Sequence, residues 1–167
     1  MPYSLKSQDD LLVEDFKNNH SWQTVFDIWT GAWKICDLLR PYAKKIDGIE
    51  IHRIYVTQFD LERKYDKLYI WDVLQHCFLE NYDVMVLGDV LEHIDKQAWQ
   101  KLLEYLKTKC NTIYVQIPYL LEQWVEFNNI YETHLQADLT NEIFLERYPW
   151  FELMGKDFII WLYRRSC

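Results

Sequence analysis

Three ionisable residues follow a short apolar segment in the middle of the chain. Val84 to Leu87 ends on Gly88, and Asp89, Glu92 and His93 come soon after it. In open α/β sheets, ligands bind outside the carboxyl ends of the strands. A carboxylate or an imidazole there can orient a substrate or exchange a proton with it. In the alternative interpretation, Asp89 and His93 only cap the helix that follows.

A second polar segment, residues 131–138, follows the next expected strand. Alternate residues of an extended segment share one face, so Glu132 and His134 would point the same way if the segment is extended. We expect this segment to contact a substrate. The alternative is a structural loop in which His134 and Asp138 hold the backbone and cap the helix after Thr140.

The acidic and imidazole side chains also raise the question of a metal. A site formed by Asp89, Glu92, His93 and His134 is conceivable, because carboxylates and imidazoles are common metal ligands. No spacing among them demands an ion, so no metal ligand is predicted.

The segment Tyr82 to His93 resembles the fourth strand and following loop of class I methyltransferases, which use S-adenosylmethionine. The likeness extends from about Trp22 to Arg164. Residues 129–140 are similar to those of a subset of small, often viral or bacterial, members. The resemblance implies a three-layer Rossmann-like α/β sheet, mostly parallel with an antiparallel C-terminal hairpin, and S-adenosylmethionine as the cofactor.

The cofactor loop of that family reads Asp-x-Gly-x-Gly-x-Gly, since glycine permits a tight turn with positive φ. Here Asp27 and Gly31 are kept, whereas Trp29 and Trp33 replace the flanking glycines. A left-handed backbone at a non-glycine residue costs ~1–2 kcal/mol. Either Trp29 swings aside or forms a wall, and the cofactor binds through Asp27, Gly31 and backbone amides, or Trp29 fills the pocket and the cofactor is lost.

Two further acidic residues have the spacing of cofactor ligands. Glu50 stands 19 positions after Gly31. In nucleotide-binding α/β folds, an acidic residue ~20 positions after the glycine-rich loop accepts hydrogen bonds from ribose hydroxyls. Asp72 matches the family position that contacts the adenine amino group, and Trp71 or Val73 would flank the ring. Both acids also suit ordinary strand-end or loop positions.

The resemblance places Asp89, Glu92 and His93 near the transferred methyl. Methyl transfer is an in-line displacement, so positioning supplies most of the help. A base is needed only where the acceptor loses a proton, and His93 is the natural candidate because the ordinary pKa of histidine is ~6.5.

The predicted function is S-adenosylmethionine-dependent methyl transfer to an unidentified small-molecule or partner-borne acceptor. Its catalytic candidates are Asp89, His93 and His134, and Asp89 also counts among the candidates for cofactor contact. The alternative is a catalytically inactive, methyltransferase-like binding or assembly protein whose cofactor pocket is altered by Trp29.

An α/β framework has to bring these residues together. A capping-box pattern over residues 7–10 predicts an N-terminal helix. Alternating strands and helices predict a parallel sheet, and the last two strands, joined around 155–157, are connected too tightly for a crossover and must be antiparallel. Residues 54–65 are ambiguous, and 119–139 form a long loop of the kind that often binds ligands. The other predicted helices are 32–43, 95–109 and 140–147, and the predicted strands are 23–28, 46–51, 67–71, 82–88, 112–117, 151–154 and 158–163.

The composition limits the expected number of domains, the kinds of partner and the location of the protein. The 167 residues, half of them hydrophobic and 17% aromatic, suit a single domain with a helical extension over 1–20. The formal charge of −8 disfavours a nucleic-acid partner. The chain lacks the regions of a signal peptide, a run of ~20 apolar residues and paired cysteines. We therefore expect a cytoplasmic protein without a membrane partner; the sequence does not indicate its oligomeric state.

Overall fold

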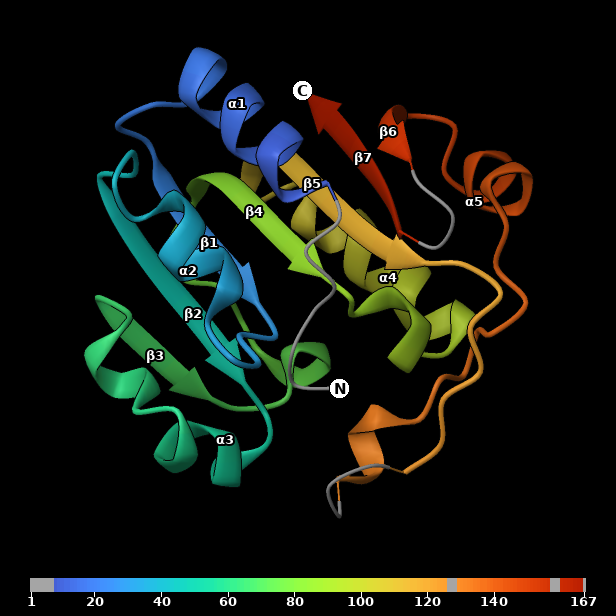
Figure 1. Cartoon of the computed structure of the whole chain (residues 1–167), viewed down its shortest axis with the longest axis horizontal. Helices are drawn as coiled ribbons and strands as arrows, with labels where there is room; N and C mark the ends of the chain where they lie inside the picture. The colour runs from blue at the N-terminus through green and yellow to red at the C-terminus, as the bar shows by residue number, and fades with distance from the viewer. Residues whose placement is uncertain (1–7, 126–128, 157–159, 167) are drawn as a thin grey trace.

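The computed structural model describes residues 8–125, 129–156 and 160–166. Over these residues the strands form one seven-stranded sheet in the order β3-β2-β1-β4-β5-β7-β6. Strands β1 to β5 are parallel, whereas β7 is antiparallel to both β5 and β6 (Figure 1). The predicted fold class is therefore confirmed. The strands are β1 (Thr24–Ile28), β2 (Lys45–Glu50), β3 (Lys67–Ile70), β4 (Tyr82–Gly88), β5 (Cys110–Pro118), β6 (Glu152–Lys156) and β7 (Ile160–Ser166).

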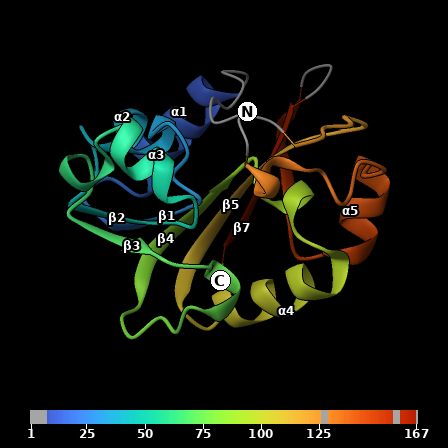
Figure 2. The same cartoon turned by 90° about the horizontal axis from the view of Figure 1, so that it is seen from below.

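Helices cover both faces of the sheet. One face carries α1 (Asp9–Asn19), α2 (Lys34–Leu39) and α3 (Arg53–Gln58), and the other carries α4 (Lys96–Leu106) and α5 (Asn141–Arg147) (Figure 2). The ambiguous stretch 54–65 contains all of α3 except its first residue, and a 3-10 turn, η1 (Leu61–Arg63). No helix in the described ranges is both long and apolar enough to cross a bilayer.

The apolar segment before Gly88 is explained by this layering. Val84 and Val86 belong to the core under α1 to α3, whereas Met85 and Leu87 belong to the core under α4 and α5. A parallel strand buried on both faces needs apolar side chains at every position. The run therefore lies at the centre of the sheet and directs the polar residues after it to the carboxyl edge.

Helix α2 is shorter than predicted at both ends. Trp33 has a left-handed backbone with φ 57°, so the helix begins at Lys34 rather than at residue 32. At the other end, Pro41 has no amide hydrogen with which to continue the helix. The helix accordingly ends at Leu39.

The C-terminal hairpin turns later than predicted. Gly155 and Lys156 pair with Leu162 and Trp161 as part of β6, so their assignment to the turn was wrong; Asp157 lies outside the described residues, as does Ser7 of the predicted capping box. A Cβ on Gly155 would lie 2.5 Å from the Leu11 side chain. Glycine at this position lets α1 pack closely against the strand without a shift of that side chain.

Candidate functional site

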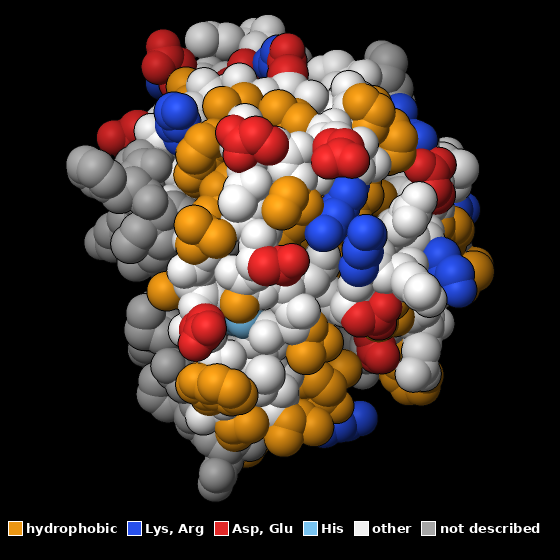
Figure 3. Space-filling model, turned by 90° about the vertical axis from the view of Figure 1, so that its right-hand side faces the viewer, with side chains coloured by type: hydrophobic (Ala, Val, Ile, Leu, Met, Phe, Trp, Pro, Cys, Tyr) orange, Lys and Arg blue, Asp and Glu red, His pale blue; other side chains and the backbone are white. Residues whose placement is uncertain are grey.

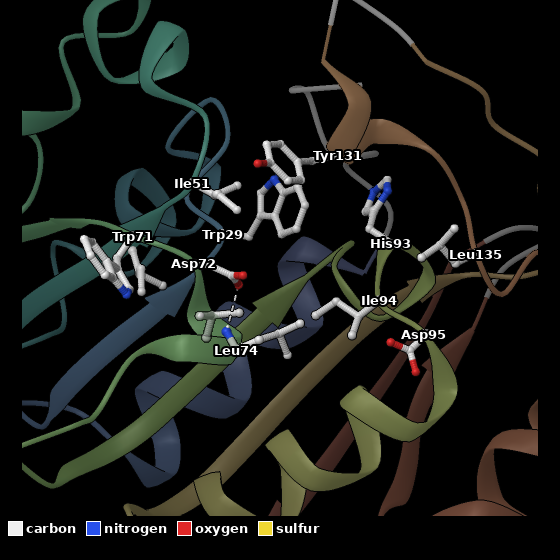
Figure 4. A pocket seen from close by; sticks show the side chains of 12 residues that line it. Trp29, Ile51, Trp71, Asp72, Leu74, His93, Ile94, Asp95, Tyr131 and Leu135 are labelled. Atoms are coloured by element: carbon white, nitrogen blue, oxygen red, sulfur yellow. Dashed lines mark hydrogen bonds between the residues drawn. The ribbon is translucent and has the colours of Figure 1, made fainter.

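A pocket lies at the carboxyl ends of β1 to β4, where the strand order reverses between β1 and β4. It encloses about 600 Å³ of empty space, including space open to solvent. Open α/β sheets bind ligands at this kind of switch point. The residues that line it are Trp29, Ile49, Ile51, Trp71, Asp72, Val73, Leu74, His93, Ile94, Asp95, Tyr131 and Leu135 (Figure 4).

The loop after β1 keeps the backbone of a glycine-rich turn. Trp29, Gly31 and Trp33 all have positive φ, at 69°, 48° and 57°. The amides of Trp29 and Thr30 donate to the Ile49 carbonyl at 3.0 and 3.2 Å. Hydrogen bonds from the loop to β2 therefore hold a left-handed backbone conformation, which glycine would adopt without strain.

A pair of variants measures this strain. Trp29→Ala and Trp29→Gly remove the same indole, but alanine keeps the steric cost of positive φ. We expect Trp29→Gly to be the more stable of the two by about 1 kcal/mol, against the usual ranking of alanine over glycine. Urea denaturation of both variants measures the difference, and an alanine variant of equal or greater stability would contradict the strain.

The Trp29 ring forms a wall of the pocket. It stacks on His93 with 5.2 Å between ring centroids and 24° between planes, and meets Tyr131 edge-on at 6.4 Å. The Trp33 side chain makes its contacts outside the pocket: its Nε1 donates to Asp37 at 2.6 Å and its ring packs on Phe59. Of the two tryptophans that replace glycines, only Trp29 lines the pocket.

Asp27 lies beneath the loop and does not line the pocket. Strand alternation turns it toward the α2 side of the sheet, where Tyr65 Oη donates to its Oδ2 at 2.6 Å. Burial raises the pKa of Asp27 to about 7, although the Tyr65 hydrogen bond and Lys34 lower it.

Glu50 is also turned inward. Its carboxylate accepts hydrogen bonds from the amides of Gly31 at 3.0 Å and His52 at 2.7 Å, and from Thr30 Oγ1 at 3.3 Å. Burial raises the pKa of Glu50 to about 7 against these hydrogen bonds. In this structure Glu50 ties the loop to β2 and is fully buried.

Asp72 and Val73 do line the pocket, at the end of β3. Asp72 Oδ1 accepts from the Leu74 amide at 2.9 Å and so begins the short turn η2 (Val73–Gln75). Asp72 thus starts a turn, as its structural interpretation has it, and also lines the pocket; contact with an adenine amino group stays a prediction.

The residues after β4 separate into different roles. Asp95, rather than Asp89 or His93, caps α4, with Oδ1 accepting from the Gln97 and Ala98 amides at 3.0 Å; the capping interpretation was therefore wrong. Asp89 has a left-handed backbone with φ 53°, and its amide donates to the Gln116 carbonyl.

Two side chains of the turn η3 (Leu91–His93) are buried beside the pocket. Burial and, to a smaller extent, the nearby His134 lower the pKa of His93 to about 4. Burial and the Asp89 carboxylate raise the pKa of Glu92 well above its usual range. His93 is accordingly neutral at pH 7.

The segment after β5 folds against η3. It is not extended at Ile130–Glu132, which form the 3-10 turn η4, so the geometry considered for Glu132 and His134 does not hold. Glu132 accepts from Tyr55 Oη at 2.9 Å. His134 Nδ1 lies 2.6 Å from the Leu121 carbonyl, and its ring meets that of His93 edge-on at 4.8 Å.

Some lining residues were not singled out from the sequence. Tyr131 and Leu135 belong to the polar segment expected to bind a substrate, so their segment was the signal. Ile51 and Ile94 lie one and six residues beyond strand ends, and position at the sheet edge could have suggested them. No sequence signal indicates Tyr65, which reaches Asp27 from 38 residues away.

The sequence matches no protein-family model and no curated protein, but solved structures share its fold. An S-adenosylmethionine-dependent methyltransferase from Clostridium acetobutylicum has a TM-score of 0.71 at 10% identity, over 99% of this chain and 93% of that chain. The N-methyltransferase NodS from Bradyrhizobium japonicum, in complex with S-adenosyl-L-homocysteine, has a TM-score of 0.70 at 11% identity, over 96% of this chain and 86% of that chain. The methyltransferase domain of bacterial CtHen1 has a TM-score of 0.68 at 18% identity, over 97% of this chain and 98% of that chain. The resemblance to class I methyltransferases is confirmed as a likeness of fold.

Proposed function

We propose that this chain is an S-adenosylmethionine-dependent methyltransferase that binds its cofactor in the pocket at the ends of β1 to β4. The observation that carries the proposal is the combination of a left-handed turn after β1 with an apolar pocket and a carboxylate after β3. The shared fold supports it, since the NodS structure holds S-adenosyl-L-homocysteine.

The residues present fit an adenosine group. Ile49, Ile51 and Val73 give the pocket apolar walls, which suit the faces of a flat base. Asp72 accepts two hydrogen bonds from described residues, one of them at 3.4 Å. A carboxylate has about four acceptor positions, so Asp72 retains capacity for an amino group.

When bound, S-adenosylmethionine supplies an electrophilic methyl on a positively charged sulfur. Trp29, Gly31, Asp72 and Val73 would contact the cofactor, and the indole face of Trp29 suits a cation. We assign Asp27 and Glu50 an indirect role, because both are buried beneath the loop and position it.

Asp89, His93 and His134 would border the reacting end. His93 is neutral at pH 7, so its ring has a lone pair that can accept a proton from a hydroxyl or amine. Positioning of the acceptor against the methyl would supply most of the acceleration.

The acceptor side of the pocket is apolar. Leu135 and Tyr131 line the pocket and are exposed, as are Trp124 and Ile130 of the same segment. Figure 3 shows hydrophobic side chains gathered on the lower part of the face that this segment covers. We propose an acceptor with an apolar portion, either a small molecule or an exposed group of a partner.

Calorimetric titration with S-adenosylmethionine and S-adenosylhomocysteine tests the proposal. We expect micromolar binding, weakened about tenfold by Asp72→Asn, because a hydrogen bond to a charged acceptor contributes ~1.5 kcal/mol or more. Asparagine keeps the cap on the Leu74 amide. Asp60→Asn is the matched control, at an exposed carboxylate away from the pocket, and should bind like the wild type.

A second function keeps one observation in its favour. The Trp29 ring stacked on His93 joins the ends of β1 and β4, where the family places the methionine part of the cofactor. An inactive binding or assembly protein would show no binding at millimolar ligand, and Trp29→Gly would restore it. That result would replace the proposed activity with this alternative.

A further inference from the structure

Three potential metal ligands come together beside the pocket from two separate segments. Glu92 and His93 belong to η3, and His134 follows η4. One ligand atom from each of the three lies within 4.8 Å of the others. His93 Nε2 and Glu92 Oε1 are 3.8 Å apart. None of the methyl-transfer roles proposed above uses Glu92.

Backbone contacts orient both imidazoles. His93 Nδ1 lies 3.3 Å from the Thr133 carbonyl, and His134 Nδ1 lies 2.6 Å from the Leu121 carbonyl. A carbonyl oxygen only accepts hydrogen bonds, so each Nδ1 carries a proton; in the neutral form of either ring the lone pair is then on Nε2. Metal-binding histidines are typically fixed in this way by a second hydrogen bond.

The carboxylate lacks a partner that its burial requires. Glu92 is 1% exposed, and its Oε2 has no hydrogen-bond partner within residues 8–125, 129–156 and 160–166. A buried carboxylate oxygen without a donor or a cation is costly. Such an atom, on a carboxylate that has one oxygen within 4.8 Å of a ring nitrogen of each imidazole, indicates a missing positive charge.

The segments that carry the ligands are held together. The Glu92 carbonyl accepts from the amides of Leu135 at 2.6 Å and Gln136 at 3.1 Å. Gln136 Nε2 donates to the carbonyls of Leu91 at 2.9 Å and Ile94 at 2.7 Å. These bonds lie on both sides of the cluster, so its geometry is fixed by backbone as well as by side chains.

We propose that Glu92, His93 and His134 bind a divalent transition-metal ion, with Zn²⁺ as the best-suited species. Two imidazoles and one carboxylate form a known ligand set for zinc that leaves a position open for water or a substrate oxygen. Bonds of ~2.0–2.1 Å place tetrahedral ligands roughly 3.3 Å apart, so binding requires side-chain movements of about 1 Å. The ion would occupy the His93 Nε2 lone pair, so with metal bound His93 would be a ligand and not a base; binding of the ion itself does not require methyl transfer.

Titration of chelator-treated protein with Co²⁺ and Zn²⁺ tests the site. We expect one equivalent of Co²⁺ to give visible absorption without a thiolate charge-transfer band, and Zn²⁺ to displace it at micromolar concentration. Zn²⁺ should also raise the Tm of the wild type by mass action. Glu92→Gln and His134→Gln should each weaken binding at least tenfold and remove the Tm shift.

His76→Gln and Cys77→Ser are the controls, because both residues lie outside the cluster and offer common metal ligands. Both should bind Co²⁺ like the wild type. Absence of saturable binding, a thiolate band, or loss of binding in either control would overturn the site. Should Glu92→Gln not fold, His134→Gln with the Co²⁺ spectrum decides the same question.

Discussion

Replacement of Trp29 by alanine is expected to weaken S-adenosylmethionine binding about 30-fold. The indole lines the pocket and stacks on His93 at 5.2 Å, so it offers an aromatic face to the positively charged part of the cofactor. A desolvated cation–aromatic contact contributes about 2 kcal/mol, which corresponds to roughly that factor in Kd. Calorimetric titration of wild type and variant measures it.

Trp33→Ala is the matched control. Trp33 shares the left-handed backbone, at φ 57°, but its ring packs on Phe59 and its Nε1 donates to Asp37. Binding by this variant should stay within a factor of three of the wild type. If Trp29→Ala instead bound the cofactor more tightly, the indole would be an obstruction rather than a wall.

The contribution of Asp27 and Glu50 to stability is expected to fall as the pH rises from about 4 to about 7, opposite in sign to the contribution of His93, whose pKa is lowered. Asp27 and Glu50 have pKa values raised to about 7 by burial, whereas the unfolded chain titrates near ~4. Between these values the folded protein keeps protons that the unfolded chain releases, so the linkage slope is negative. The stabilisation from each group is complete below about pH 4 and lost above about pH 7.

The Asp27→Asn variant measures the part of this pH dependence of stability that comes from Asp27. Each unit of raised pKa corresponds to ~1.4 kcal/mol, so the variant should exceed the wild type in stability at pH 8 by on the order of 4 kcal/mol. Near pH 4 the two should be alike. Urea denaturation across this range measures the difference, with Glu62→Gln as an exposed control; parallel curves for wild type and Asp27→Asn would mean that Asp27 is ionised in the folded protein.

The sequence predicts most of the framework because burial imposes a local pattern. Val84 to Leu87 had to be apolar on both faces, and the tight link before β7 allowed only an antiparallel pairing. The start of α2 was mispredicted because the backbone at Trp33 is left-handed, which residue type did not reveal. Helical spacing indicates that a helix is present more reliably than where it begins.

The site was only partly predictable. Asp72, Val73, Trp29 and His93 line the pocket because strand ends determine their place. The spacing of Glu50 was right for a ribose ligand, but spacing does not determine whether a side chain points out of the edge or back under the loop. The approach of His134 to Glu92 depends on backbone bonds between distant segments, which no local pattern contains.

The turn after β1 has a consequence for how such loops can be found. The amides of Trp29 and Gly31 donate to the Ile49 carbonyl and the Glu50 carboxylate, and the amide of Trp33 donates to the Thr30 carbonyl. These bonds hold the three residues in the torsion angles of a glycine-rich loop. The turn keeps its form with tryptophan at the two flanking positions, and glycine there would relax the turn rather than disrupt it. Torsion angles can therefore identify a loop of this form where the residue types alone do not.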